Sequence, residues 1–448
     1  MPSPVICWFR QDLRLSDNPA WFAACSSGSP VIPIYILDDQ NAKEWKIGEA
    51  SCVWLHHSLE QLSQNMNGNL LCMTGKADRI IPDLIQRYGV KKIFWNRCYE
   101  PWRVNHDKII KENLLTKNIL IEDFNGSLLW EPWEIKKQDG TPYKVFTPYF
   151  RKGCLNAPPP REPLRQPKLP TFYPTSEQIN KPNDLNLLPK TPRWDTPMMS
   201  FWTTGESAAQ TALDTFLDKK LSGYKEGRNF PEHDQTSKLS PHLHFGEISP
   251  NQIWYKATEY GIKSGHNSDL DCFQSELAWR EFSHSLLFYN PHLPTSPLNR
   301  KFENFNWADP DQQTLEKWQT GQTGYPIVDA GMRELWATGY MHNRVRMIVA
   351  SFLIKDLRYH WRIGEDWFWN TLVDANLANN AVSWQWVAGC GADAAPYFRI
   401  FNPTTQSEKF DPLKNYIRKW APDSHTLPPI VDHKKAREAA LEAFKAIK

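Results

Sequence analysis

Residues 69–96, NLLCMTGKADRIIPDLIQRYGVKKIFWN, decide the fold class of the first part of this chain. They hold two short apolar runs, 69–75 and 90–96, with an amphipathic helical pattern over 77–89 between them. Continuous apolar runs of this length are typical of strands that are buried on both faces, and parallel sheets have such strands. The stretch therefore predicts a strand–helix–strand unit of an α/β domain.

The same alternation continues on both sides of this unit. Further strands are predicted at 4–9, 30–37 and 118–124, and further helices at 18–25 and 51–64. No G-x-G-x-x-G or P-loop follows the first strand, which argues against a standard dinucleotide or nucleotide phosphate site. A ligand can still bind at the carboxyl ends of the strands.

Length, charge and cysteine content limit which classes of protein this chain can belong to. The 448 residues allow two or three domains, and 21 tryptophans are more than core packing usually needs. The 52 Lys and Arg residues nearly balance the 50 Asp and Glu residues, so any nucleic-acid contact must depend on a local basic surface. The eight cysteines are scattered without C-x-x-C or zinc spacing, so we expect reduced thiols in a cytoplasmic protein and no metal site. Charge within the first ten residues argues against a signal peptide or membrane span.

A proline-rich stretch separates two kinds of sequence. Residues 157–198 contain eleven prolines and few periodic apolar positions, as expected for a long connecting segment. After it the pattern is helical, and no convincing strand follows residue 200. We therefore predict an α/β domain at 1–130, a linker at 131–202 and an all-helical domain at 203–448.

Several helix boundaries can be predicted in the second part. Thr203 and Glu206 have capping-box spacing before an apolar stripe, and Ser249 begins a helix that we expect to end near Gly261. Ser268 is the expected cap of the helix over 269–288. The remaining expected boundaries are a helix over 326–338 that ends at Gly339 and a helix over 341–357.

The segment SELAWREF, 275–282, and Phe273 just before it place four notable side chains on one helical face. These are Phe273, Glu276, Trp279 and Arg280. The simpler interpretation is an exposed Glu276–Arg280 pair four residues apart, with little energetic value. The alternative is a cleft in which an acid, a flat aromatic and a guanidinium bind a planar, polar ligand.

The segment MHNRVRM also places polar and charged side chains together on one helical face. Asn343, Arg346 and Met347 share one helical face, and Arg344 lies on another. Arg346 begins an otherwise apolar helix, so it needs an anion, and Asp374 is the candidate. A structural salt bridge is the simpler interpretation, and it is compatible with a ligand site.

Two polar segments have weaker signals. The turn TSKLSPHLHFGE, 236–247, carries hydroxyls that can bind phosphate oxygens or only cap a helix. The segment 397–412 is predicted as a polar loop in which Arg399, Gln406 and Lys409 contact phosphodiesters or are simply solvated.

The segment VDANLANNAVSWQW, 373–386, contains one acid, three asparagines and two tryptophans. If it is helical near its end, Trp384 and Trp386 point about 200° apart, to opposite sides. The two rings can then serve different sites.

Taken together, these segments resemble the DNA photolyase/cryptochrome family of flavoproteins. The matching pieces span nearly the whole chain in family order: 7–18 (CWFRQDLRLSDN), 228–250 (RNFPEHDQTSKLSPHLHFGEISP), 275–282, 323–347 (TGYPIVDAGMRELWATGYMHNRVRM), 373–386 and 395–412 (APYFRIFNPTTQSEKFDP). The resemblance implies an α/β antenna domain joined by a long linker to a helical FAD domain, which agrees with the organisation predicted above.

Within the family, the pattern is most similar to cyclobutane pyrimidine dimer photolyases. The resemblance implies that one electron passes from photoexcited, reduced, anionic FAD to a dimer flipped out of UV-damaged DNA. Photolyases for the 6-4 photoproduct would carry histidines at the positions of Asn343 and Met347, so that branch is disfavoured. The other alternative is a cryptochrome-like photoreceptor without repair activity, which often carries a longer C-terminal extension than the short basic helix expected here.

The resemblance also assigns residues. Those implied at the cofactor are Tyr224, Thr236, Ser237, Lys238, Leu239, Ser240, Phe273, Arg346, Asp374, Asn376 and Asn380, with Asn380 at flavin N5. Those implied at the DNA are Glu276, Trp279, Arg280, Asn343, Arg344, Met347, Trp386, Arg399 and Gln406. Trp384, Trp361 and Trp307 match the family's electron-transfer chain from the surface to the flavin.

The sequence departs from the family pattern at Phe273, where some members carry tryptophan, so the flavin contact there is altered. The segments 240–250 and 389–403 are closer to class III photolyases and plant cryptochromes than to the best-known class I enzymes. For a second, antenna chromophore we favour methenyltetrahydrofolate over a deazaflavin. We expect a monomer that has no membrane contact.

Overall fold

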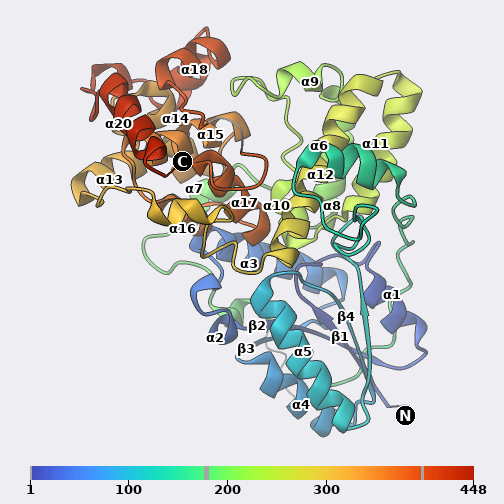
Figure 1. Ribbon diagram of the computed structural model, residues 1–448. Coiled ribbons are helices and arrows are strands. Elements are labelled where there is room, and N and C mark those ends of the chain that lie inside the picture. Colours follow the sequence, from blue (N-terminus) through green and yellow to red (C-terminus); the bar gives the residue numbers. More distant parts are fainter. Residues whose placement is uncertain (1–2, 176–180, 395–397, 448) are drawn as a thin grey trace.

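The computed structural model describes residues 3–175, 181–394 and 398–447. A parallel sheet of five strands, in the order β3-β2-β1-β4-β5, forms one end of the molecule, and a large helical assembly forms the other (Figure 1). The strands are β1 Val5–Phe9, β2 Val31–Leu37, β3 Leu71–Thr74, β4 Lys92–Asn96 and β5 Leu120–Phe124. All five predicted strands, and with them the predicted fold class, are confirmed.

Helices cover both faces of the sheet because the strands present apolar side chains on both faces. Cys7 and Phe9 of β1 pack with α1 and α3, whereas Ile6 and Trp8 pack with α4 and α5. The helices of this part are α1 Pro19–Ser26, α2 Asp39–Ala42, α3 Glu49–Asn65, α4 Ala77–Tyr88 and α5 Pro101–Thr116. The sequence patterns did not predict α2 or α5.

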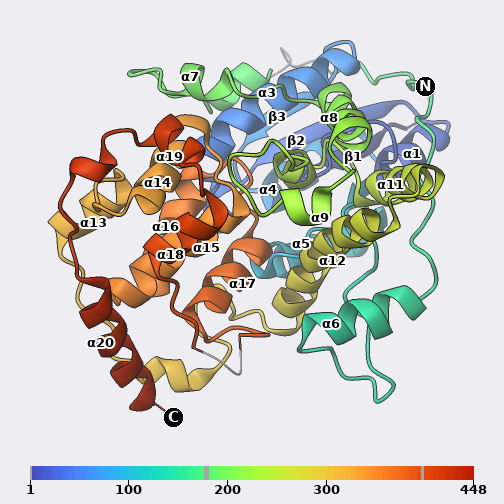
Figure 2. The ribbon, with the colours of Figure 1, turned by 90° about the horizontal axis from the view of Figure 1, so that it is seen from above.

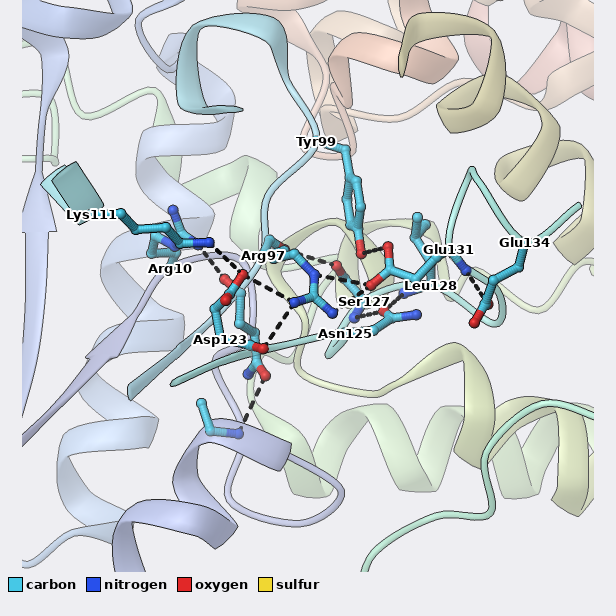
Figure 3. A network of polar contacts seen from close by, with 12 residues as sticks. Arg10, Arg97, Tyr99, Lys111, Asp123, Asn125, Ser127, Leu128, Glu131 and Glu134 are labelled. Atoms are coloured by element: carbon cyan, nitrogen blue, oxygen red, sulfur yellow. Dashed lines mark hydrogen bonds and ion pairs between the residues drawn. The ribbon is translucent and has the colours of Figure 1, made fainter. Parts of the chain in front are cut away.

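A network of charges fixes the chain where it leaves the sheet (Figure 3). The Arg97 guanidinium contacts Asp123 at 3.0 Å and Glu131 at 2.7 Å, which joins the end of β5 to the following segment. The Tyr99 hydroxyl donates to Glu131 at 2.7 Å, and Lys111 pairs with Asp123 at 2.8 Å. Beyond this network, the described residues before 206 include short helical turns, among them α6 Phe146–Pro148 and α7 Asp195–Met199.

The second part is helical, and in its described residues no strand follows residue 200, as predicted. Its helices are α8 Glu206–Lys219, α9 Tyr224–Gly227, α10 Ser240–Phe245, α11 Pro250–Ser264, α12 Asn267–Tyr289, α13 Gln312–Gln319, α14 Pro326–Thr338, α15 Asn343–Ser351, α16 Trp361–Thr371, α17 Leu377–Ala388, α18 Pro403–Phe410, α19 Asn415–Trp420 and α20 His433–Lys445. None of the described helices combines the length and apolar character needed to cross a bilayer.

The predicted capping box at Thr203 is wrong. Helix α8 begins at Glu206 after Gly205, and no side chain caps it. The Glu206 carboxylate instead accepts hydrogen bonds from the backbone N–H groups of Leu15 and Ser16, at 2.8 and 3.0 Å. A contact with the N-terminal part has therefore replaced the local one.

Three other boundaries also differ from the predictions. Ser249 is the N-cap of α11, as predicted, but α11 continues past Gly261 to Ser264. Helix α12 begins at Asn267, so Ser268 lies within its first turn and is not its cap. Residues 403–410, expected as a loop, form α18, which begins because the Asn402 side chain accepts from two backbone N–H groups.

Candidate functional site

The site is built around α17, which packs between α12 on one side and α15 and α16 on the other (Figure 2). Asn376 is its N-cap, and the Asn376 side-chain oxygen accepts from the Asn379 backbone N–H at 3.1 Å. The Asn376 side chain therefore has a structural role. Trp384 and Trp386 follow on different faces. Trp384 is 2% exposed, whereas Trp386 is half-buried at the protein surface.

The predicted pair of Arg346 and Asp374 is present. The guanidinium donates to both carboxylate oxygens, at 3.1 and 2.9 Å, and its Nε donates to the Met341 carbonyl at 2.7 Å. The Ser240 hydroxyl also donates to Asp374, at 2.6 Å. Burial opposes the charge on Arg346, but the adjacent Asp374 carboxylate keeps its pKa above the ordinary value. One carboxylate, just before α17, thus joins α15 to the first residue of α10.

Asn380 lies one turn into α17 and is buried. Its Nδ2 donates to the backbone carbonyl of Glu365 in α16 at 3.0 Å. Because this contact uses the amide's donor end and fixes its orientation, the carbonyl end is the part suited to accept a hydrogen bond from a ligand.

The turn 236–240 is held by one internal contact and by contacts with Asp234 and Tyr340. The Ser237 hydroxyl accepts from the Leu239 backbone N–H at 3.4 Å, and Leu239 is buried. Thr236 hydrogen-bonds Tyr340, and exposed Lys238 pairs with Asp234 at 3.5 Å. Next to the turn, Tyr224 and Phe273 pack edge to face with ring centroids 5.6 Å apart, inside the apolar core.

The Glu276–Arg280 pair of the simpler interpretation is absent, and each residue has another partner. Glu276 forms an ion pair with Arg228, which follows α9, and its side chain is 31% exposed. Arg280 contacts Glu281 at 3.1 Å and is largely buried, which lowers its pKa. Arg280 therefore supports the core of α12, and Arg228 is a site residue that the helical pattern did not reveal.

Trp279 is half-buried, and one face of its ring is stacked on Phe146 of α6, with centroids 3.9 Å apart and planes 10° apart. Phe282 packs against the same indole at 5.8 Å. These two rings hold the indole plane in a fixed orientation.

The three site residues of α15 lie near its first turn. Asn343 is exposed, and Met347 lies one turn further on. Arg344 donates to Asn229 at 2.6 Å and lies 4.3 Å from the Phe410 ring centroid, so α15 is tied to α18. Burial lowers the pKa of His342, which caps α15, to about 3, so this imidazole is neutral.

The segment after α17 adds a basic edge. Exposed Arg399 lies 5.7 Å from the Trp386 ring centroid, and Gln406 is half-buried on α18. A shallow hollow beside Trp386 is lined by Arg399 and Phe401. Residues 395–397 of the motif quoted above lie outside the described part of the chain.

The chain is similar to known proteins over its whole length. Residues 5–168 match the family model described as DNA photolyase, and residues 273–429 match the FAD binding domain of DNA photolyase. A deoxyribodipyrimidine photo-lyase of Agrobacterium fabrum is 44% identical over the whole of this chain and 98% of its own length. This chain belongs to the DNA photolyase family. The family and the enzyme class predicted from the sequence are confirmed.

Two further comparisons describe the range of this photolyase family. The crystal structure of a bacterial class III photolyase from Agrobacterium tumefaciens has a TM-score of 0.94 and 44% identity, covering 100% of this chain and 98% of that one. Cryptochrome-1 of Arabidopsis thaliana is 35% identical over 98% of this chain and 66% of its own length. Photolyases and a cryptochrome are therefore both similar to this chain over nearly its whole length.

The residues present fit the FAD that the photolyase domain implies. Both carboxyl oxygens of buried Glu365, beside Asn380, have no hydrogen-bond partner in the described part of the protein, so this region holds polar atoms that can meet a ligand. The Ser240 hydroxyl, the Arg346–Asp374 pair and the Asn380 amide add donors and acceptors of the kinds a flavin nucleotide needs.

Aromatic rings lead from this photolyase site toward the surface. Trp361 begins α16 and is 1% exposed, and His360 lies between it and half-buried Trp307, with centroid distances of 5.4 and 5.0 Å. Gly364 allows Trp384 to approach α16, because a Cβ there would be 2.0 Å from the Trp384 ring. The sequence predicted the three tryptophans, and only the structure adds His360.

A second cavity lies in the α/β part, at the carboxyl ends of β1 and β2. Its walls are aromatic and charged, with Trp8, Tyr35 and Trp102 alongside Arg10 and Arg103. The Arg10 guanidinium is 4.6 Å from the Trp8 ring and pairs with Asp107 at 2.7 Å. This is the edge of the sheet where the sequence allowed a ligand.

Proposed function

We propose that this photolyase splits cyclobutane pyrimidine dimers in DNA under blue light. The observation that carries the proposal is the joint placement of Glu276 and Trp279 on α12, Trp386 on α17, and Asn343 and Met347 on α15. An acid, two indoles, an amide and a thioether on neighbouring helices suit a pair of linked pyrimidine bases. Extrusion from the duplex brings such a lesion to the site.

The flavin would be held by groups that already contact one another. FAD, when bound and reduced, supplies the electron that light transfers to the dimer. Arg346, fixed by Asp374, places a positive charge where the anionic flavin would lie. Ser240 and the turn before it would bind phosphate and ribose oxygens, and the Asn380 carbonyl would accept from flavin N5–H.

The protein's task on the DNA side is to orient the lesion. Glu276 would accept from the base N–H groups, and Arg228 holds its carboxylate in place. Trp279 would stack on one base with the face that Phe146 leaves free. Trp386 would stack on the other side of the dimer, with Arg399 beside it for the backbone phosphate.

Trp384, Trp361 and Trp307 would return the flavin to its reduced state. Trp384 and Trp361 are buried and Trp307 is half-buried toward the surface, which suits a stepwise electron path. His360 fills the space between the outer two rings.

An antenna chromophore would collect additional light, and we infer methenyltetrahydrofolate ahead of a deazaflavin. The cavity at the ends of β1 and β2 supports a planar second ligand, because its walls combine aromatic rings with cations. Acid extraction of the purified protein should release a pteridine absorbance besides FAD. FAD alone, after expression with folate available, would contradict the antenna assignment.

The expected partner is UV-damaged DNA, bound by a monomer in the cytoplasm. All eight cysteines lie in the described residues and are unpaired, which agrees with a reducing compartment.

Binding to three matched oligonucleotides separates the alternatives. We expect the protein to bind DNA with a cyclobutane dimer at least ~10-fold more tightly than undamaged DNA, because stacking on flipped bases contributes about 1–3 kcal/mol per base. Preference for the 6-4 photoproduct would instead support that branch. Equal affinity for all three duplexes, at a fixed salt concentration, would favour a cryptochrome-type photoreceptor.

A further inference from the structure

The last helix, α20, ends in an aromatic contact that the proposed repair site does not explain. Phe444 stacks on Phe398 with centroids 4.3 Å apart and planes 4° apart. At the other end of α20, His433 pairs with Asp356 at 2.5 Å. The face between them is docked through small buried side chains, Ala436 and Ala440. Helix α20 is therefore held to the helical part along its whole length.

A buried lysine contacts the same aromatic ring. Lys355 is 0% exposed, and its Nζ lies 3.0 Å from the Phe398 ring centroid. The Nζ also donates to the Ala388 carbonyl at 2.8 Å. Phe444 and the amine must lie on opposite faces of Phe398, because a parallel ring at 4.3 Å would overlap an atom at 3.0 Å on the same side. Phe398 is thus clamped between α20 and Lys355.

The clamp holds two segments that border the DNA side of the site. Ala388 is the last residue of α17, two residues after Trp386, and Arg399 directly follows Phe398. Gly389 permits the close approach, since a Cβ there would be 3.1 Å from the Phe398 ring. The distance of 5.7 Å between Arg399 and the Trp386 ring therefore depends on where Phe398 is held.

We infer that Lys355 and Phe444 are positioning residues that set Trp386 and Arg399 for damaged DNA, so the C-terminal helix belongs to the lesion-binding apparatus. This inference rests on the proposed function. Neither residue touches DNA: both act through Phe398. The contact explains why a lysine is tolerated at a fully buried position, where burial lowers its pKa and opposes its charge.

Two variants and one control test the inference. Lys355→Met keeps the length of the side chain but removes the donor to Ala388, and Phe444→Ala removes the stacked ring. Leu441→Ala on the exposed side of α20 is the matched control. We expect the first two to weaken affinity for dimer-containing DNA about three- to tenfold, as loss of a buried hydrogen bond or an aromatic contact does. The control should stay within ~2-fold.

Flavin absorbance and the unfolding midpoint separate positioning from simple destabilisation. Lys355→Met relieves the desolvation of a buried amine but also leaves the Ala388 carbonyl without its donor, so its unfolding midpoint should change little, although its affinity for damaged DNA should fall. Wild-type affinity in both variants, or an affinity loss in Lys355→Met only together with a lower midpoint, would overturn the inference. A wild-type protein without preference for the dimer would instead overturn the proposed function, and this inference with it.

Discussion

Replacing Trp361 with phenylalanine should nearly abolish photoreduction of the oxidised flavin, while the pre-reduced protein should still repair dimers. Trp361 is buried at the start of α16, the helix that Trp384 packs against, and its ring contacts that of His360. Phenylalanine fills most of the same space, but its ring is much harder to oxidise than indole. The electron path would therefore be interrupted with little change of structure. Flavin absorbance under blue light, with an external thiol reductant, measures the rate.

Trp318→Phe is the control for this experiment. Trp318 is fully buried in the same apolar cluster as Trp361 but lies outside the proposed chain. It should photoreduce at the wild-type rate. If Trp361→Phe is photoreduced as fast as the control, the electron path does not pass through Trp361.

Replacing Trp279 with alanine should weaken binding of dimer-containing DNA by about 5- to 150-fold, the range that corresponds to 1–3 kcal/mol of stacking on one base. The free face of the indole is the surface that a flipped base would meet, since the other face is stacked on Phe146. Affinity for undamaged DNA should change little. Anisotropy titrations with dimer-containing and undamaged duplexes measure both effects.

Trp279→Phe serves as the matched variant. It retains a ring to stack on Phe146, so it should keep most of the stability and part of the affinity. Wild-type affinity for damaged DNA in Trp279→Ala would mean that the lesion binds elsewhere. Equal losses on damaged and undamaged DNA would also contradict the assignment.

The sheet could be predicted because its strands β1 and β2 are buried on both faces, so each is a nearly continuous apolar run that no amphipathic helix resembles. Helix α5 could not, because it buries His106 and Asp107 while Ile109 and Leu115 are exposed, which removes the helical pattern. The predicted cap at Thr203 is wrong for a related reason: Glu206 bonds to the chain near Ser16, far away in sequence. Local patterns do not report such long-range contacts.

Of the ion pairs at the site, one could be predicted from the sequence and another could not. The pair of Arg346 and Asp374 was predicted because a charge within an apolar helix needs a counter-charge. The simpler interpretation of Glu276, a pair with Arg280 on the same helix, is wrong because Arg280 pairs with Glu281. The true partner, Arg228, is 48 positions away along the chain. Sequence spacing can show that a charge needs a partner, but it cannot choose among distant candidates.

Photoreversal of a defined lesion tests the central claim most directly. The protein would be loaded with FAD, reduced in the dark, mixed with an oligonucleotide that contains one thymine dimer, and exposed to blue light. We predict that intact thymines appear in proportion to the light absorbed, and that none appear in the dark or with Trp279→Ala at a DNA concentration too low for that variant to bind. Tight binding of the dimer without any photoreversal would contradict the account.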